Sequence, residues 1–182
     1  SYSDLLLSIA VAQWGKLDAR EEIHSLVDEM NNEGDGFAFS KDLVLKAGLM
    51  LSEIGSVGFK VENFNKENMA KLEKNWGRIK GSLLLAVRLL ASFGFNAQNL
   101  RADSALLPIA YYLNFRQLDS SYLSRSEYAE DRANLRHWFV RSLLKASGIW
   151  GSGLDTLLTA LRKDISDNGK DRFPVDVLEL SL

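Results

Sequence analysis

The chain has 182 residues, 46% of them hydrophobic and 25% charged, and its formal net charge is −2. That length suits one domain with a sizeable core, and the near-neutral charge gives the chain as a whole no attraction to nucleic acid or anionic membrane. Cysteine is absent, which excludes disulfides and thiolate chemistry and favours a reducing compartment. Neither a membrane-spanning run nor a signal-peptide pattern is present, so we expect a cytoplasmic protein without a membrane partner.

The sequence begins with Ser1 rather than methionine, and Ser3 and Asp4 lead directly into an apolar run. This start is typical of a piece taken from a larger protein. We therefore expect residues 1–182 to be a single helical domain that is a fragment of a longer chain.

Apolar residues recur every three or four positions along almost the whole chain, which predicts an all-α fold. We expect an irregular bundle of about seven or eight helices. Residues 105–115 are apolar around the full helical circumference, with Pro108 near the first turn. This segment is predicted to be the central, buried helix.

Caps and glycines divide the first part of the chain. The first predicted helix covers residues 5–14 and is capped by Ser3 or Asp4. The second begins at Asp18, whose spacing to Glu21 fits a variant of the capping box, and ends at the turn 31–36.

Ser40 is expected to cap a third helix over residues 41–51, and a brief extended piece is expected at 58–61. One continuous apolar face then predicts the longest helix, residues 66–93. Gly94 should end this helix in a Schellman turn.

Ser124 and Glu127 have the spacing of a capping box, which predicts a helix running from there to about Ala146. A further helix is expected over residues 154–165, and Pro174 allows one last short turn.

No residue pattern predicts catalysis. His24 and His137 are isolated and lack a ligand or nucleophile at motif spacing. The turn 31–36 resembles a calcium loop only in part, because asparagine begins it and Asp42 stands where a bidentate glutamate belongs. Phosphate-binding glycine motifs are also absent. We therefore expect no catalytic residue, no metal site and no cofactor in this chain.

Three basic residues, Lys71, Lys74 and Arg78, share one face of the predicted helix 66–93. They form a weak candidate surface for DNA, because phosphate groups bind clustered cations.

Gly77 and Gly81 stand four residues apart in the interior of the same helix, where each costs about 1 kcal/mol relative to alanine. We favour close packing of another helix of the same domain across them. The alternative is a partner chain, including a second copy in a homodimer, with Trp150 as an exposed aromatic residue of the interface.

Four strings carry a resemblance: NWGRIK (75–80), FGFN (93–96), LLPIAYYL (106–113) and LRHWFVRSLLKASGIWGSGLD (135–155). They resemble the helical region of the GmrSD-like family of bacterial DNA-targeting proteins, which is related to type IV restriction enzymes. In that family a ParB-like domain with a D-G-Q-Q-R motif comes first and is linked to nucleotide hydrolysis. Neither this motif nor an H-N-H nuclease motif occurs here, so no catalytic residue is carried over to this chain.

The resemblance implies a non-catalytic helical domain of a phage-defence protein, with the rest of the parent chain as its partner and DNA as a further candidate. The alternatives are a protein-interaction or dimerisation module and a weak nucleic-acid-binding domain.

Overall fold

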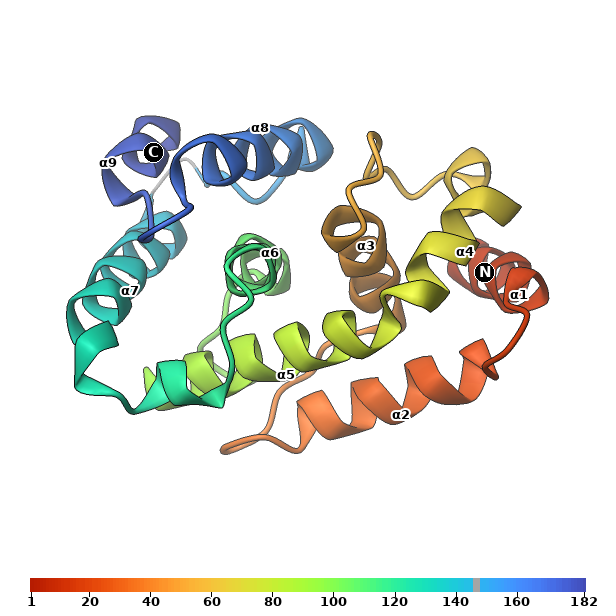
Figure 1. Cartoon of the computed structure of the whole chain (residues 1–182), viewed down its shortest axis with the longest axis horizontal. Helices are drawn as coiled ribbons and strands as arrows, with labels where there is room; N and C mark the ends of the chain where they lie inside the picture. Colours follow the sequence, from red (N-terminus) through yellow and green to blue (C-terminus); the bar gives the residue numbers. More distant parts are fainter. Residues whose placement is uncertain (146–147) are drawn as a thin grey trace.

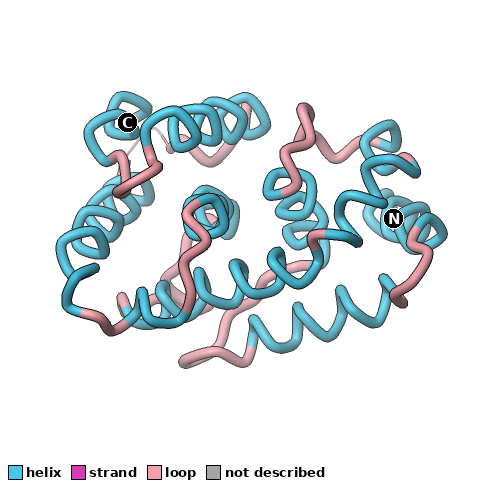
Figure 2. The backbone as a smooth tube through the Cα atoms, viewed as in Figure 1, coloured by secondary structure: helices cyan, strands magenta, loops and turns pink. Residues whose placement is uncertain are grey.

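A computed structural model of the protein describes residues 1–145 and 148–182. Over these residues the chain forms helices joined by loops and turns, without a strand (Figure 1, Figure 2). The predicted all-α fold is confirmed. In this part of the chain, no helix combines the length and the apolar character that crossing a bilayer requires.

Nine α-helices are present in the described ranges, together with short 3-10 turns. The helices are α1 (Tyr2–Gln13), α2 (Ala19–Asn31), α3 (Lys41–Leu51), α4 (Lys66–Lys74), α5 (Trp76–Ser92), α6 (Leu106–Phe115), α7 (Ala129–Leu144), α8 (Leu154–Asn168) and α9 (Val175–Leu178). The 3-10 turns are Val61–Phe64, Asp103–Ala105, Ser120–Leu123, Ser126–Tyr128 and Glu179–Ser181.

Helix α6 is the centre of the fold. Figure 1 shows it almost end-on, between α5, α3 and α8, and all three helices contact it. Every residue from Leu106 to Leu113 is buried, and Pro108 lies in the first turn. Burial of each leucine-sized side chain stabilises the fold by about 1.5–3 kcal/mol. The prediction of a central apolar helix is therefore confirmed.

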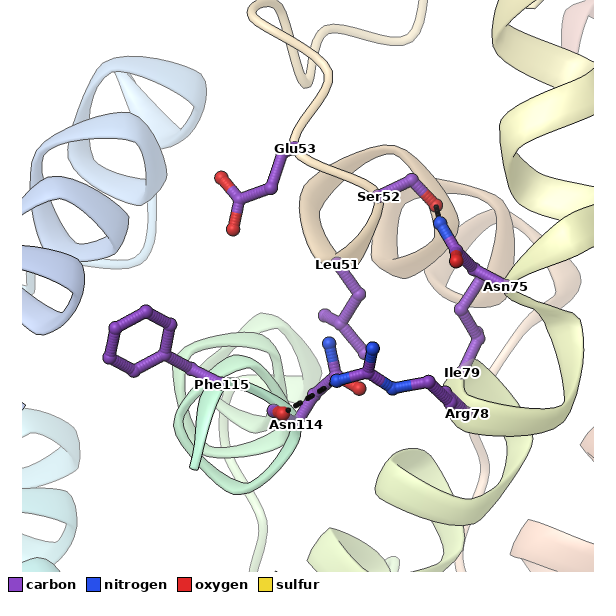
Figure 3. Close-up of a pocket in the computed structure, with 8 residues that line it drawn as sticks. All are labelled: Leu51, Ser52, Glu53, Asn75, Arg78, Ile79, Asn114 and Phe115. Atoms are coloured by element: carbon purple, nitrogen blue, oxygen red, sulfur yellow. Dashed lines mark hydrogen bonds between the residues drawn. The ribbon is translucent and has the colours of Figure 1, made fainter. Parts of the chain in front are cut away.

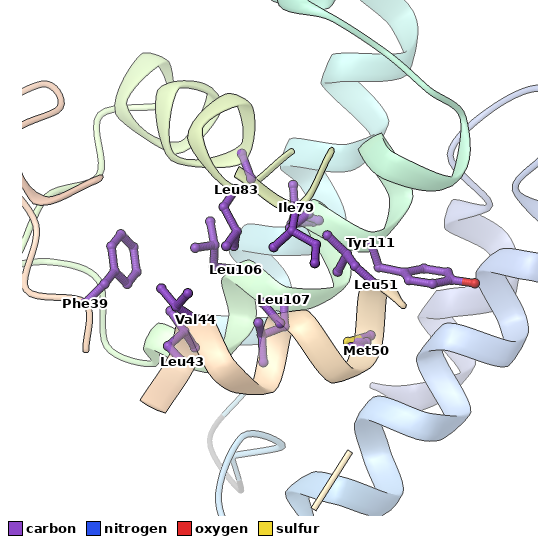
Figure 4. Packing of buried hydrophobic residues seen from close by; sticks show 14 of the residues in the cluster. Phe39, Leu43, Val44, Met50, Leu51, Ile79, Leu83, Leu106, Leu107 and Tyr111 are labelled. Atoms are coloured by element: carbon purple, nitrogen blue, oxygen red, sulfur yellow. The ribbon is translucent and has the colours of Figure 1, made fainter. Parts of the chain in front are cut away.

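Side chains of α3 and α5 pack against those of α6 (Figure 4). Leu43 and Val44 of α3, Ile79 and Leu83 of α5, and Leu107 of α6 all belong to this buried cluster. Helices α1, α2 and α4 lie at the end of the molecule near the N-terminus, and α7, α8 and α9 lie at the end near the C-terminus (Figure 1).

Several predicted helix ends are confirmed. The Asp18 carboxylate accepts a hydrogen bond from the Glu21 N–H at 3.2 Å, and the Ser40 hydroxyl accepts one from the Leu43 N–H at 3.3 Å. Gly94 has a φ of +92° in the turn that ends α5. The Phe95 N–H donates to the Leu90 carbonyl at 3.0 Å, which is the long bond of a Schellman turn.

The prediction of one helix over residues 66–93 is wrong, because the chain bends at Asn75 between α4 and α5. Asn75 has φ −92° and ψ 4°, outside the helical range, and its side chain donates to the Ser52 hydroxyl at 3.4 Å. This bond joins the bend to the end of α3, and asparagine has a low intrinsic preference for continued helix. The bend accounts for the ninth helix.

The predicted capping box of Ser124 and Glu127 does not form, and α7 begins later, at Ala129. The Arg132 side chain instead donates to the carbonyls of Tyr122 at 2.7 Å and Arg125 at 2.8 Å. These tertiary bonds hold the preceding residues in two 3-10 turns, and they outweigh the local capping signal. The predicted helix end at Ala146 lies outside the described residues.

Two smaller predictions are also wrong. Ser1, not Ser3 or Asp4, caps α1, because the Ser1 hydroxyl accepts from the Asp4 N–H at 3.2 Å. The piece 58–61 is not extended throughout, since Val61 begins a 3-10 turn.

Candidate functional site

Two adjoining hollows lie along the outward side of α5, and we call them together the α5 groove. The first hollow has a volume of about 240 Å³ and lies between the end of α3, the start of α5 and the end of α6. The second, of about 520 Å³, lies between α5 and the segment that follows α6. Arg78 and Asn114 line both hollows, so the two hollows meet at this pair.

Polar side chains surround the first hollow, and buried apolar side chains underlie it (Figure 3). The Arg78 guanidinium donates to the Asn114 carbonyl oxygen at 3.3 Å, which anchors the arginine to the last turn of α6. Leu51 and Ile79 are only 5% and 1% exposed. The hollow therefore combines a charged rim with an apolar floor.

Glu53 lines the first hollow in an unusual backbone conformation. Its φ is +59°, in the left-handed region that favours glycine. Its carboxylate accepts a hydrogen bond from the Tyr111 hydroxyl at 2.5 Å. Burial raises the pKa of Tyr111 well above its ordinary value, and the bond to Glu53 raises this pKa further. The tyrosine therefore stays a hydrogen-bond donor at neutral pH.

Gln117 lines the second hollow and shares this backbone conformation, with a φ of +54°. It follows α6 in a Schellman turn, in which the Leu118 N–H donates to the Leu113 carbonyl at 2.9 Å. Glu53 and Gln117 are the two non-glycine residues with positive φ in the described part of the chain. Both therefore lie on the α5 groove, one in each hollow.

Gly81 also lines the second hollow, and both predicted interface glycines are exposed. A Cβ atom added at Gly77 or Gly81 would meet no atom of the described chain within 4 Å, leaving aside their own helix turns. The prediction that another helix of the same domain packs closely across them is therefore wrong. Their face of α5 is open.

The structure separates the predicted basic trio. The helix on which a shared face was expected bends at Asn75, so Lys71 and Lys74 belong to α4 and Arg78 to α5. Lys71 lies 3.7 Å from the Glu67 carboxylate. Of the three residues, Arg78 alone lines the α5 groove.

Trp150 is only partly exposed, contrary to the prediction of an exposed aromatic side chain. Its ring packs edge to face on Trp138, with the centroids 6.1 Å apart. This contact places Trp150 against the core beside α7.

Both histidines are exposed. The His137 Nε2 atom lies 3.8 Å from a carboxylate oxygen of Glu179. Within residues 1–145 and 148–182, no three metal-ligating side chains gather closely enough to hold an ion.

Asp131 is the centre of a polar cluster that sequence reasoning missed. One carboxylate oxygen accepts from the hydroxyls of Tyr112 and Tyr122, each at 2.7 Å, and the other accepts from the Phe173 N–H at 2.7 Å. Arg116 lies 3.6 Å from the carboxylate. Burial, more than any neighbour, raises the pKa of both tyrosines far above its ordinary value. The partners come from distant positions in the chain, so no local motif could announce the cluster.

No protein-family model matches this chain, and no curated protein matches it either.

Proposed function

We propose that this chain is a non-catalytic helical domain of a cytoplasmic GmrSD-like DNA-targeting protein. In this proposal it supports a nucleotide-using ParB-like domain that is not part of the 182 residues. The family assignment is supported by the four sequence strings at residues 75–80, 93–96, 106–113 and 135–155. The non-catalytic role is supported by largely buried charged side chains that hydrogen-bond one helix to another.

The proposed role rests on one observation: the most deeply buried charged side chains form hydrogen bonds that link different helices. Arg162 of α8 is 8% exposed and donates to the carbonyls of Met50 at 3.1 Å and Ile54 at 2.7 Å, at the end of α3. Asp131 similarly joins α6, α7 and the segment before α9 through its hydrogen bonds. Saturated hydrogen bonding of this kind fixes the positions of helices.

The direct test is an activity assay on the purified chain. We expect no nucleotide hydrolysis and no cleavage of modified or unmodified DNA by residues 1–182 alone. Turnover that remains at constant specific activity through successive purification steps would overturn the non-catalytic role.

A second candidate function, an interaction or dimerisation module, is favoured by the open face at Gly77 and Gly81. Small residues allow the backbone of a partner helix to approach closely. Light scattering should then show concentration-dependent association that Gly81→Leu abolishes, because the leucine would fill the second hollow. A particle mass that stays monomeric at all concentrations contradicts this candidate.

A third candidate, nucleic-acid binding, is favoured by Lys74 and Arg78, which have no carboxylate within 4 Å in the described part of the chain. Binding should weaken as salt rises, with a log–log slope of about −0.9 for each phosphate contacted. The double variant Lys74→Glu with Arg78→Glu should abolish it, and Lys170→Glu, which reverses one charge in the turn before α9, is the control. Equal binding by all three proteins would exclude this surface.

A further inference from the structure

Glu53 occupies a position that glycine would fill at lower cost. It is the left-handed residue of the Schellman turn that ends α3, where its N–H donates to the Met50 carbonyl at 3.3 Å. A side chain in this conformation crowds the following carbonyl. In addition, a carboxylate at a helix C-terminus faces the partial negative charge of unpaired carbonyl groups. The turn itself therefore gives no reason for glutamate at this position.

What glutamate supplies is a carboxylate at the rim of the first hollow. The Tyr111 hydroxyl binds one of its oxygens, Oε1, at 2.5 Å. The second oxygen has no hydrogen-bond partner in the described chain, and the residue is exposed. The side chain is therefore held in place while half of its hydrogen-bonding capacity is open to a ligand.

Arg78 reaches the same hollow from a different helix (Figure 3). One of its N–H groups is engaged by the Asn114 carbonyl, and the other donors on the guanidinium remain available. Glu53 and Arg78 form no ion pair with each other in the described chain, although they line one hollow of about 240 Å³. Figure 3 shows them on different sides of this hollow, so two opposite charges line it without neutralising each other.

We propose that the first hollow binds a small zwitterion with an aliphatic side chain, such as a free branched-chain amino acid. The ligand ammonium group lies against Glu53, its carboxylate on Arg78, and its aliphatic side chain on Phe115, the partly exposed apolar residue of the lining. The volume lies just below the roughly 300–1,000 Å³ of ordinary ligand pockets, so it admits one small molecule. Because both charges are exposed, the dissociation constant should be on the order of 1 mM.

The test is an NMR titration of the ¹⁵N-labelled chain with L-leucine. Saturable shifts are expected at the amides of Ser52, Asn75 and Asn114, which line the hollow. Isoamylamine carries only the cation and 4-methylpentanoate only the anion, so each should bind about tenfold more weakly or less. N-acetyl-leucine amide, which lacks both charges, should not bind. This last probe separates a free amino acid from a leucine inside a peptide.

Two variants and a control variant test whether the charges of Glu53 and Arg78 bind the ligand. Glu53→Gln keeps an acceptor for Tyr111 and removes the charge, and Arg78→Gln removes the guanidinium; each should weaken leucine binding about tenfold. Lys170→Gln removes an exposed charge in the segment before α9, outside the α5 groove, and should leave the affinity unchanged. Thermal unfolding monitors the fold of each variant.

Three results would overturn the proposal: no saturable shift with leucine, equally tight binding of a single-charge analogue, or equal loss of affinity in Lys170→Gln. None of them bears on the non-catalytic role, because leucine binding requires no reaction.

Discussion

At the level of single residues, glycine substitutions at Gln117 and Glu53, the two side chains with positive φ in the described chain, should change stability by different amounts. Gln117 has a φ of +54°, and its side chain makes no hydrogen bond in the described chain. Gln117→Gly should therefore relieve steric strain and raise the free energy of unfolding by about 0.5–1 kcal/mol, after subtraction of the extra freedom of glycine in the unfolded chain. Urea denaturation measures this change, and a loss of stability would contradict it.

Glu53→Gly should gain less than Gln117→Gly, because it also removes the bond to Tyr111, which is worth about 1 kcal/mol. The same urea measurement compares the two variants. Equal stabilisation of both would mean that the carboxylate of Glu53 contributes nothing to the fold.

Glu73 makes stability depend on pH. Its carboxylate accepts from the backbone N–H groups of Leu17 at 2.8 Å, Lys16 at 2.7 Å and Gly15 at 3.1 Å, and these bonds lower its pKa. Because the folded pKa is below the unfolded one, the stabilisation is fully present above the unfolded pKa of about 4.3 and is lost as pH falls through the folded pKa.

Glu73→Gln should therefore lower the free energy of unfolding by about 0.5–1 kcal/mol at pH 7, a value reduced for solvent exposure. The difference from the wild type should shrink toward zero in strongly acidic solution. Urea denaturation at several pH values checks this, and a difference that is constant with pH would show that the charge is not responsible.

At the level of helices, the sequence correctly predicted those helix ends that depend on hydrogen bonds between residues close together in the chain. The caps at Asp18 and Ser40 and the Schellman turn at Gly94 involve residues within one turn, and all three formed. The start of α7 depends instead on Arg132 binding the Tyr122 carbonyl, a tertiary contact that spacing does not reveal. Arg132 lies ten residues from Tyr122, beyond the spacing of a capping box, so the signal at Ser124 and Glu127 could not predict this start.

The candidate site was predicted only in part, for the same reason. The sequence predicted Arg78 as a candidate phosphate-binding cation and Gly81 as a candidate interface residue. Both line the α5 groove. Glu53, Asn114 and Gln117 come from other elements and carry no motif. The left-handed conformation of Glu53 was not predicted, because glutamate rarely adopts a positive φ.

Substitution of Arg162 tests most directly whether hydrogen bonds between α8 and the end of α3 stabilise the fold. Arg162→Met should destabilise the fold by about 2–4 kcal/mol, because the carbonyls of Met50 and Ile54 lose a charged donor in a buried position. The adjacent Lys163→Met removes an exposed pair with Asp167 and should cost less than about 0.5 kcal/mol. Chemical denaturation compares them, and equal effects would refute the structural role of Arg162.

At the level of the whole molecule, the core is built around α6 while the outward side of α5 stays open. Gly81→Leu should therefore raise the stability of the isolated chain by about 0.5–1 kcal/mol, because leucine favours helix and nothing in the described chain blocks it. Thermal unfolding measures the change. A marked loss of stability would show that the α5 groove is covered in solution.

The proposed non-catalytic role requires that these helices hold one another in place without performing a reaction. The most direct measurement is the steady-state rate of nucleotide hydrolysis by the purified chain, with and without DNA, compared with the same sample after thermal unfolding. We predict identical background rates in the folded and unfolded samples. A rate that belongs only to the folded chain and rises in proportion to its concentration would contradict the account.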